Sequence, residues 1–147
     1  MVLIALLQRV SEARVEVEGE TVGAIDAGIL ALVAVQPEDG ETQCRRMLER
    51  ILGYRMFADQ QDRMNLSLRD TGGGLLLVSQ FTLAADTRSG MRPGFSTAAT
   101  PAQGRIWFDH LVEIARQQWQ GVEIGRYGTH MKVHLINDGP VTFRLEV

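Results

Sequence analysis

Apolar residues form short runs along most of the chain, and these runs predict strands. Residues 2–10 are mostly apolar and are expected to form a strand, and the continuous apolar run over residues 28–35 is typical of a strand buried on both faces. Residues 13–17 alternate between apolar and charged side chains, and a Glu18-Gly19 turn leads from them into residues 21–25, so we expect a hairpin there. Further strands are expected over residues 75–81, 122–124, 131–136 and 141–147.

Two segments carry apolar residues at helical spacing instead. One helix is predicted over residues 41–56, and a second begins at Thr100-Pro101, a favourable N-cap and first-turn pair, and continues through Trp119. Because helices and strands are segregated rather than alternating, we predict an α+β fold, with a curved, barrel-like sheet packed with two main helices. The length of the chain suits a single domain, residues 1–147.

Charge limits the classes of partner. The formal net charge of −3 argues against a surface that binds nucleic acid everywhere. Lys132 is the only lysine, so nearly all positive charge sits on arginine, whose planar fork suits phosphate groups. A local basic face around Arg63, Arg69, Arg88 and Arg92 is one interpretation of the arginines, and simple solvation of helix surfaces is the other.

Composition also indicates a compartment. No apolar stretch approaches the ~20 residues needed to cross a bilayer, and the first seven residues lack the basic region of a signal peptide. Cys44 is the only cysteine, so an intrachain disulfide is impossible, which fits a reducing compartment. We therefore expect a cytoplasmic protein without membrane association.

A polar motif follows the apolar run over residues 75–78. It consists of Ser79, Gln80 and Thr82, with Phe81 between them. Polar groups at the end of a buried strand must be hydrogen-bonded or available to a ligand. One interpretation is a catalytic cluster whose backbone N–H groups hold an oxyanion. The other is a strand end capped by hydroxyl side chains.

A second polar motif separates residues 131–136 from residues 141–147. Its residues are Asn137, Asp138, Gly139 and Pro140, all of which are common turn formers. On the residues alone, a plain turn between two strands is the favoured interpretation.

Together the two motifs resemble the signature of a known enzyme family. Residues 79–83 (Ser-Gln-Phe-Thr-Leu) and 137–142 (Asn-Asp-Gly-Pro-Val-Thr) are similar to segments of D-aminoacyl-tRNA deacylases, homodimeric enzymes that hydrolyse D-amino acids from mischarged tRNA. The resemblance covers essentially the whole chain. It implies a barrel-like α+β fold, a homodimer with a cross-subunit active site and an aminoacyl-tRNA substrate.

The resemblance also implies roles for residues of the first motif. Ser79, Gln80, Phe81 and Thr82 would form the catalytic segment, with the backbone N–H groups around Phe81 and Thr82 holding the oxyanion. The terminal 2′-hydroxyl of the tRNA would assist the hydrolysis, with no obligatory protein nucleophile. Thr82 as the nucleophile is the alternative mechanism that the sequence leaves open.

The second motif would select the substrate. The Gly139–Pro140 peptide is expected to be cis and to project its carbonyl groups into the partner's active site, where it would reject L-aminoacyl-tRNA. Asn137 and Met131 are expected to bind substrate as well. A site of this kind would pass glycine, so mischarged glycyl-tRNA is an expected second substrate. Arg63 and Arg92 are the expected tRNA-binding residues.

Metal and thiol chemistry are not expected. His130 and His134 are four residues apart, as in zinc-binding helices, but their segment alternates like a strand and has no obvious third ligand. Cys44 falls in a predicted helix without an associated motif. We therefore expect no metal and no other cofactor.

Two other functions remain open on the sequence. The chain can be interpreted as a Thr82-dependent esterase or amidase that acts on small acyl substrates. It can also be interpreted as a non-catalytic module that binds the end of a tRNA or a protein. Near absence of lysine and net acidity weigh against broad RNA binding.

Overall fold

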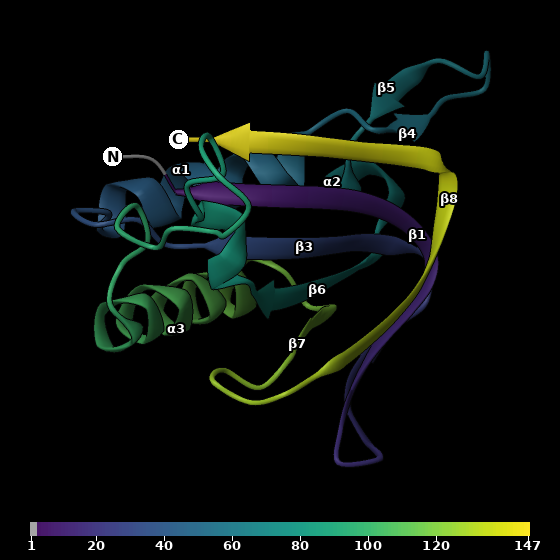
Figure 1. Ribbon diagram of the computed structural model, residues 1–147. Helices are drawn as coiled ribbons and strands as arrows, with labels where there is room; N and C mark the ends of the chain where they lie inside the picture. The colour runs from purple at the N-terminus through teal and green to yellow at the C-terminus, as the bar shows by residue number, and fades with distance from the viewer. Residues whose placement is uncertain (1–2) are drawn as a thin grey trace.

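The computed structural model describes residues 3–147, which form a curved mixed sheet with helices against one side (Figure 1). The strand order is β2-β1-β3-β6-β7. Both β2 and β3 pair with one edge of β1, and β8 pairs with the opposite edge. The elements are β1 (Ile4–Val17), β2 (Glu20–Ile25), β3 (Gly28–Ala34), α1 (Glu41–Gly53), β4 (Phe57–Ala58), β5 (Met64–Leu66), α2 (Leu68–Thr71), β6 (Gly74–Ser79), the 3₁₀ helix η1 (Phe81–Ala84), α3 (Pro101–Gln118), β7 (Val122–Ile124) and β8 (Lys132–Glu146).

Strand β1 organises the sheet because it is long enough to pair with three others. Strand β8 runs antiparallel along its full length, while β3 and β2 pair with its first and second halves on the opposite edge. The expected separation into strands over residues 2–10 and 13–17, and again over 131–136 and 141–147, is therefore wrong. The two halves of β1 and β8 pair with each other throughout, so each remains one bent strand; the expected start at residue 2 lies outside the described residues.

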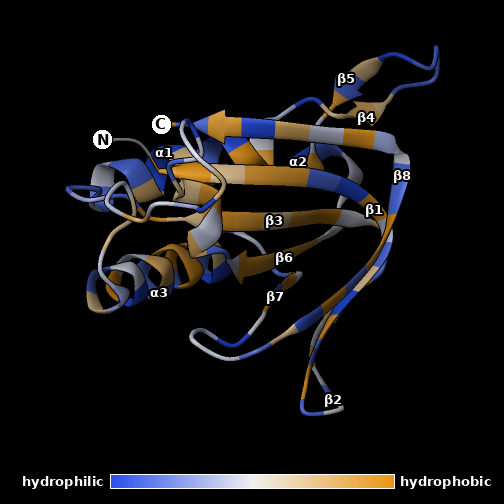
Figure 2. Cartoon of the chain, viewed as in Figure 1, coloured by the Kyte–Doolittle hydropathy of each residue, from blue (hydrophilic) through white to orange (hydrophobic). Residues whose placement is uncertain are grey.

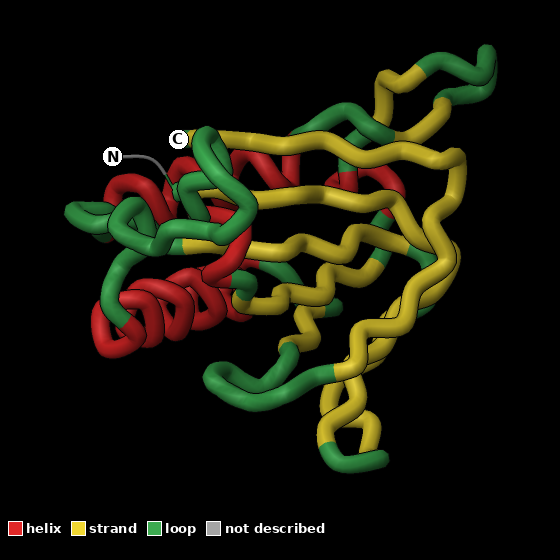
Figure 3. The backbone as a smooth tube through the Cα atoms, in the orientation of Figure 1, coloured by secondary structure: helices red, strands yellow, loops and turns green. Residues whose placement is uncertain are grey.

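The sheet curls until β2 approaches β7, which gives it a barrel-like shape (Figure 3). A Cβ atom on Gly23 would lie 2.4 Å from the carbonyl oxygen of Ile124, so only glycine permits this approach. Nearby, the Ala24 N–H donates to Glu123 Oε1 at 3.4 Å. The expected α+β fold with a curved, barrel-like sheet is confirmed.

Two cores lie on opposite faces of the central strands. Ile29 and Leu75 pack with the helices, whereas their neighbours Leu30 and Leu76 pack inside the curl made by β1, β2 and β8. Side chains alternate across a strand, so both faces must be apolar. This explains the almost continuously hydrophobic β3 and β6 in Figure 2.

Both expected helices are present, and their apolar faces contribute to the helix-side core. Helix α1 ends at Gly53 rather than at residue 56, because Tyr54 adopts an extended conformation with φ −70° and ψ 128°. The short α2 and the β4–β5 hairpin were not predicted. Within residues 3–147, no helix is both long and apolar enough to cross a bilayer.

Candidate active site

A cavity of about 840 Å³ opens beside the end of β6. Its walls come from three parts of the chain that are distant in sequence. They are the end of β6 with η1 (Val78, Ser79, Gln80, Phe81), the segment entering α3 (Phe95, Ala98, Ala99, Thr100, Pro101) and the approach to β8 (Tyr127, Gly128, Thr129, His130, Met131, Val133). Apolar walls with a few polar groups are typical of ligand sites.

The Ser79–Thr82 segment turns sharply at the mouth of this cavity. Strand β6 ends at Ser79, and the Gln80 N–H donates to the carbonyl of Val33 at 2.8 Å before the chain enters η1. The predicted strand through residue 81 is thus wrong, since β6 ends at Ser79. A turn of 3₁₀ helix bends the chain instead.

This bend leaves backbone donors free. The first N–H groups of a helical turn have no partner within the turn, and in residues 3–147 no acceptor lies within hydrogen-bond reach of the N–H of Phe81 or Thr82. Adjacent, unpaired N–H groups beside a cavity can stabilise a developing oxyanion. In this segment the backbone N–H groups, more than any side chain, are therefore suited to stabilising an oxyanion.

The Thr82 hydroxyl is poorly placed for nucleophilic attack. It accepts a hydrogen bond from Gln80 Nε2, and Thr82 does not line the cavity. Within the described chain, no histidine or carboxylate is hydrogen-bonded to the hydroxyl of Thr82 or Ser79. A hydroxyl without a neighbouring base is a weak nucleophile. Phe81, which is 59% exposed, packs its ring 5.2 Å from that of Phe95.

Tyr127 and Met131 form the facing wall. The Tyr127 hydroxyl donates to the carbonyl of Pro101 at 3.1 Å, and its approach requires Gly104, where a Cβ would lie 2.6 Å from that hydroxyl. Burial raises the pKa of Tyr127. The sulfur of Met131 accepts from the Arg126 N–H at 3.4 Å. Met131, the expected substrate-binding residue, thus lines the cavity together with Tyr127; its role in binding stays a prediction.

The Gly139-Pro140 segment is a bulge on β8. Gln8 pairs with Thr142 and Val10 pairs with Asn137, so residues 138–141 of β8 face Arg9 alone on β1. The motif therefore does not reverse the chain, and the plain turn favoured by its composition is wrong. The Gly139–Pro140 peptide is cis, as expected, and both residues are exposed.

Asn137 and Arg9 hold the bulge in place. The Asn137 amide donates to the carbonyl of Val141 at 3.0 Å and accepts from the Val141 N–H at 2.8 Å. Arg9 donates to the carbonyl of Asp138 at 2.8 Å and to that of Met56 at 3.0 Å. Arg9 was missed on the sequence, although an arginine inside an apolar strand is a signal of a specific polar contact.

Within one chain, the two motifs are not brought together. The residues that line the cavity include Ser79, Gln80 and Phe81 but neither Gly139 nor Pro140. Figure 1 shows the corner of β8 well away from the end of β6. Asn137 likewise supports the bulge rather than lining the cavity.

The predicted tRNA-binding arginines come from separate elements. Arg63 lies in the β4–β5 hairpin, and Arg92 lies in the loop closed by the Asp86–Gly94 bridge; both are exposed. Arg88 in the same loop is paired with Asp86 at 2.9 Å, and this pair lowers the pKa of Asp86 to about 2. Figure 1 shows the hairpin and the loop apart, so these arginines do not form one face.

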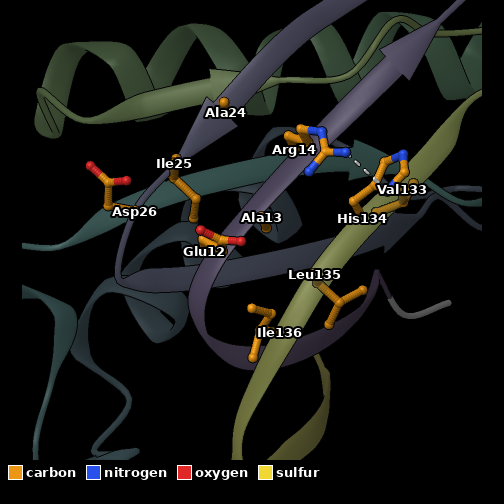
Figure 4. A pocket seen from close by; sticks show the side chains of 10 residues that line it. All are labelled: Glu12, Ala13, Arg14, Ala24, Ile25, Asp26, Val133, His134, Leu135 and Ile136. Carbon is orange, nitrogen blue, oxygen red and sulfur yellow. Dashed lines mark hydrogen bonds between the residues drawn. The ribbon is translucent and has the colours of Figure 1, made fainter. Parts of the chain in front are cut away.

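A different cavity, of about 550 Å³, lies between β1, β2 and β8. Figure 4 shows Arg14 pointing toward His134 from the neighbouring strand. Arg14 also pairs with Glu16 at 3.1 Å, and His134 lies 3.4 Å from the same carboxylate. The hydrogen bond from Arg14 and the charge of His134 lower the pKa of Glu16. The side chains of Arg14, Glu16 and His134 thus interact with one another, which is typical of a structural cluster.

Metal and thiolate chemistry have no evident basis in the described residues. Within residues 3–147, no group of three or more His, Cys, Asp or Glu side chains is arranged so that it could hold a metal ion. Burial raises the pKa of Cys44 to about 12, so its thiol is protonated at neutral pH and is a poor nucleophile.

Comparisons with known proteins agree over nearly the whole chain. A family model described as D-Tyr-tRNA(Tyr) deacylase matches residues 6–146. A D-aminoacyl-tRNA deacylase of Thioalkalivibrio sulfidiphilus is 66% identical over 145 residues, which cover 99% of this chain and 97% of that protein. One of Pseudomonas putida is 63% identical over 142 residues, which cover 97% of this chain and 98% of that protein.

Solved structures share the fold. The c-Myc DNA Unwinding Element Binding Protein superposes with a TM-score of 0.94 at 35% identity, over 98% of each chain. A probable eukaryotic D-amino acid tRNA deacylase superposes with a TM-score of 0.80 over 100% of each chain. Its identity of 18% supports similarity of fold alone.

Proposed function

The chain belongs to the D-Tyr-tRNA(Tyr) deacylase family, and on this basis we propose that it hydrolyses the ester between a D-amino acid and the terminal ribose of tRNA. The observation that carries the proposal is the pair of free N–H groups of Phe81 and Thr82 beside a cavity of about 840 Å³. Aminoacyl-tRNA is used where proteins are synthesised, so we propose a cytoplasmic location.

Hydrolysis here needs positioning more than a protein nucleophile. An ester is activated relative to an amide, and alignment together with oxyanion stabilisation lowers its barrier. The N–H groups of Phe81 and Thr82 hold the oxyanion that develops on the ester carbonyl. Gln80, bonded to the Thr82 hydroxyl, fixes the bend, and the terminal 2′-hydroxyl of the tRNA assists the attack.

A second copy of the chain completes the site. The Gly139-Pro140 bulge is exposed, held rigidly by Asn137 and Arg9, and absent from the walls of its own cavity. A rigid projection and an open cavity on the same molecule suit a two-fold dimer in which each projection enters the partner's cavity.

The backbone, rather than a side-chain pocket, then distinguishes the D-isomer of the substrate from the L-isomer. A 10⁴-fold preference corresponds to roughly 5.5 kcal/mol, whereas a pocket that senses one methylene supplies only ~1–3 kcal/mol. Carbonyl groups of Gly139 and Pro140 form a wall against which any L side chain clashes, whatever its identity. Glycine has no side chain to clash, so glycyl-tRNA is a second substrate.

The alternatives have weaker support. A Thr82-dependent esterase needs a base near a hydroxyl that, among the described residues, bonds only to Gln80. A non-catalytic tRNA-end module does not account for two adjacent N–H groups left free at the mouth of a cavity.

Deacylation of D-tyrosyl-tRNA and L-tyrosyl-tRNA by the purified chain tests the proposal. We expect rapid release of D-tyrosine and near-background release of L-tyrosine. A parallel assay with small D-tyrosyl esters distinguishes a tRNA deacylase from the alternative esterase that acts on small substrates. Equal hydrolysis of both tRNA isomers, or hydrolysis of the small esters alone, contradicts the proposal.

A further inference from the structure

A cavity of about 350 Å³ adjoins the candidate active site. Thr129 and His130 line both cavities, so a strip of two residues separates them. The smaller cavity lies between the β1–β2 turn and the start of β8. Its lining residues are Glu16, Val17, Glu18, Gly19, Arg126, Thr129, His130 and Lys132.

Two cations in this cavity have no carboxylate partner. Within residues 3–147, neither Arg126 nor Lys132 lies within 4.0 Å of a carboxylate oxygen. Many other cations of the chain do form such pairs; they are Arg9, Arg14, Arg45, Arg88, Arg105 and Arg144. The charges of Arg126 and Lys132 are therefore available to an anion.

The acidic residues of the cavity offset these charges only in part. Glu16 is opposite Lys132 in the β1–β8 ladder, but its carboxylate already pairs with Arg14 at 3.1 Å and lies 3.4 Å from His134. Glu18 occupies the β1–β2 turn with a positive φ of 51° and is exposed to solvent. In residues 3–147 its carboxylate does not lie within 4.0 Å of Arg126 or Lys132.

The segment that carries the cations is fixed. The Thr129 hydroxyl donates to the Arg126 carbonyl at 2.9 Å, and the Arg126 N–H donates to the Met131 sulfur at 3.4 Å. Tyr127 is anchored to Pro101. One side of this segment therefore lines the active-site cavity while Arg126 and Lys132 line the adjoining cavity.

We propose that Arg126 and Lys132 form a phosphate-binding subsite for the RNA strand that leads to the reacting ester. The inference rests on the proposed function. If the terminal adenosine of the tRNA occupies the larger cavity, its 5′-phosphate must leave across one rim. The rim over residues 95–101 contributes no charged residue to the lining, whereas the rim at Thr129 and His130 opens onto two unpaired cations.

This subsite acts on affinity and not on chirality. Phosphate contacts carry no information about the amino acid, and they release counterions on binding. Loss of either cation is therefore expected to raise KM for D-aminoacyl-tRNA and to leave kcat and the D/L preference unchanged.

Two small ligands that differ by the phosphodiester test the proposal. Calorimetric titration compares adenosine with cytidylyl-adenosine, in which a phosphate joins cytidine to the 5′ position of adenosine. We expect the wild-type chain to bind cytidylyl-adenosine more tightly. Arg126→Gln and Lys132→Gln each weaken its binding by about tenfold, because a charge-assisted hydrogen bond is lost, and they leave the affinity for adenosine unchanged.

A charge-matched control removes two exposed arginines that lie on the helices, Arg46→Gln with Arg116→Gln. This control keeps both affinities, whereas Arg126→Gln with Lys132→Gln abolishes the advantage of cytidylyl-adenosine. The inference is overturned if the wild-type chain fails to prefer cytidylyl-adenosine, or if both double variants act alike. Hydrolysis of D-tyrosyl-tRNA is scored separately, and its absence in the wild-type chain refutes the proposed function rather than the subsite.

Discussion

The two polar motifs of this chain are built in opposite ways. Around the Gly139-Pro140 bulge, side chains of Asn137 and Arg9 satisfy the neighbouring backbone groups. At the bend after Ser79, the N–H groups of Phe81 and Thr82 have no acceptor in the described residues. Satisfied backbone forms a rigid scaffold, while unsatisfied backbone beside a cavity is available to a ligand. Changes at the bend should therefore alter rate, and changes at the bulge should alter selectivity.

The largest effect is expected from removing a donor at the bend. Thr82→Pro deletes an N–H and disturbs the preceding residue, and loss of one oxyanion donor lowers kcat by about 10²–10³-fold. Thr82→Ala removes only the hydroxyl and its bond to Gln80, so measurable deacylation remains. Single-turnover assays on both variants, with circular dichroism as a folding control, check the pair. Complete loss of turnover in folded Thr82→Ala would favour a nucleophilic threonine instead.

A selectivity effect is expected at the bulge. Proline restricts the backbone of residue 140, and alanine removes that restriction, so the carbonyl wall becomes mobile. We expect Pro140→Ala to lower the D/L rate ratio by about tenfold or more, equivalent to at least 1.4 kcal/mol of lost discrimination. Rates with D- and L-tyrosyl-tRNA measure the ratio. An unchanged ratio in a folded dimer contradicts this explanation of chirality.

Arg9 supports the bulge, so its removal should cost stability. Arg9→Ala leaves the carbonyls of Asp138 and Met56 without their donor. Met56 is fully buried, so its unsatisfied carbonyl typically costs about 1–3 kcal/mol, whereas water can replace the donor at the exposed Asp138. Urea unfolding measures the change in the free energy of unfolding. Arg144→Ala, at an exposed position on β8, is the matched control and should change stability by about 0.5 kcal/mol or less. Equal stability of the two variants would remove Arg9 from this role.

The smallest effects are expected at the surface arginines. Arg63→Ala and Arg92→Ala should each raise KM for tRNA a few-fold and reduce the salt slope of binding by about 0.7–0.9, with the D/L ratio unchanged. Arg88→Ala is the control, because its charge is already shared with Asp86. If all three variants keep wild-type affinity and salt slope, these arginines are only solvated surface.

The sequence predicted local structure better than long-range continuity. Alternating and continuous apolar runs located most strands, and the Thr100 cap located α3. The unity of β8 was hidden, because only pairing with β1 keeps residues 132–146 in one strand across Gly139 and Pro140. Turn-forming composition cannot reveal a partner strand that is more than a hundred residues away.

The candidate site shows the same difference: local features were predictable from the sequence, and features that depend on distant segments were not. Ser79, Gln80, Phe81 and Met131, which the sequence singled out, line one cavity, and Thr82 does not; the catalytic and binding roles expected of them stay predictions. The free N–H of Thr82 depends on the 3₁₀ bend, which residue types alone do not specify. Arg9 was missed because its two acceptors, Asp138 and Met56, come from distant segments.

Mixed dimers test most directly whether the bulge of one chain guards the cavity of another. A Pro140→Ala chain, with an intact cavity, is co-assembled with an excess of a Thr82→Pro chain, which has an intact bulge. In these dimers the only working cavity faces an intact Gly139-Pro140 segment. We predict that L-tyrosyl-tRNA hydrolysis per Pro140→Ala chain falls to the wild-type background while D-tyrosyl-tRNA hydrolysis continues. Hydrolysis of L-tyrosyl-tRNA that persists at the level of the Pro140→Ala homodimer would contradict the cross-subunit site.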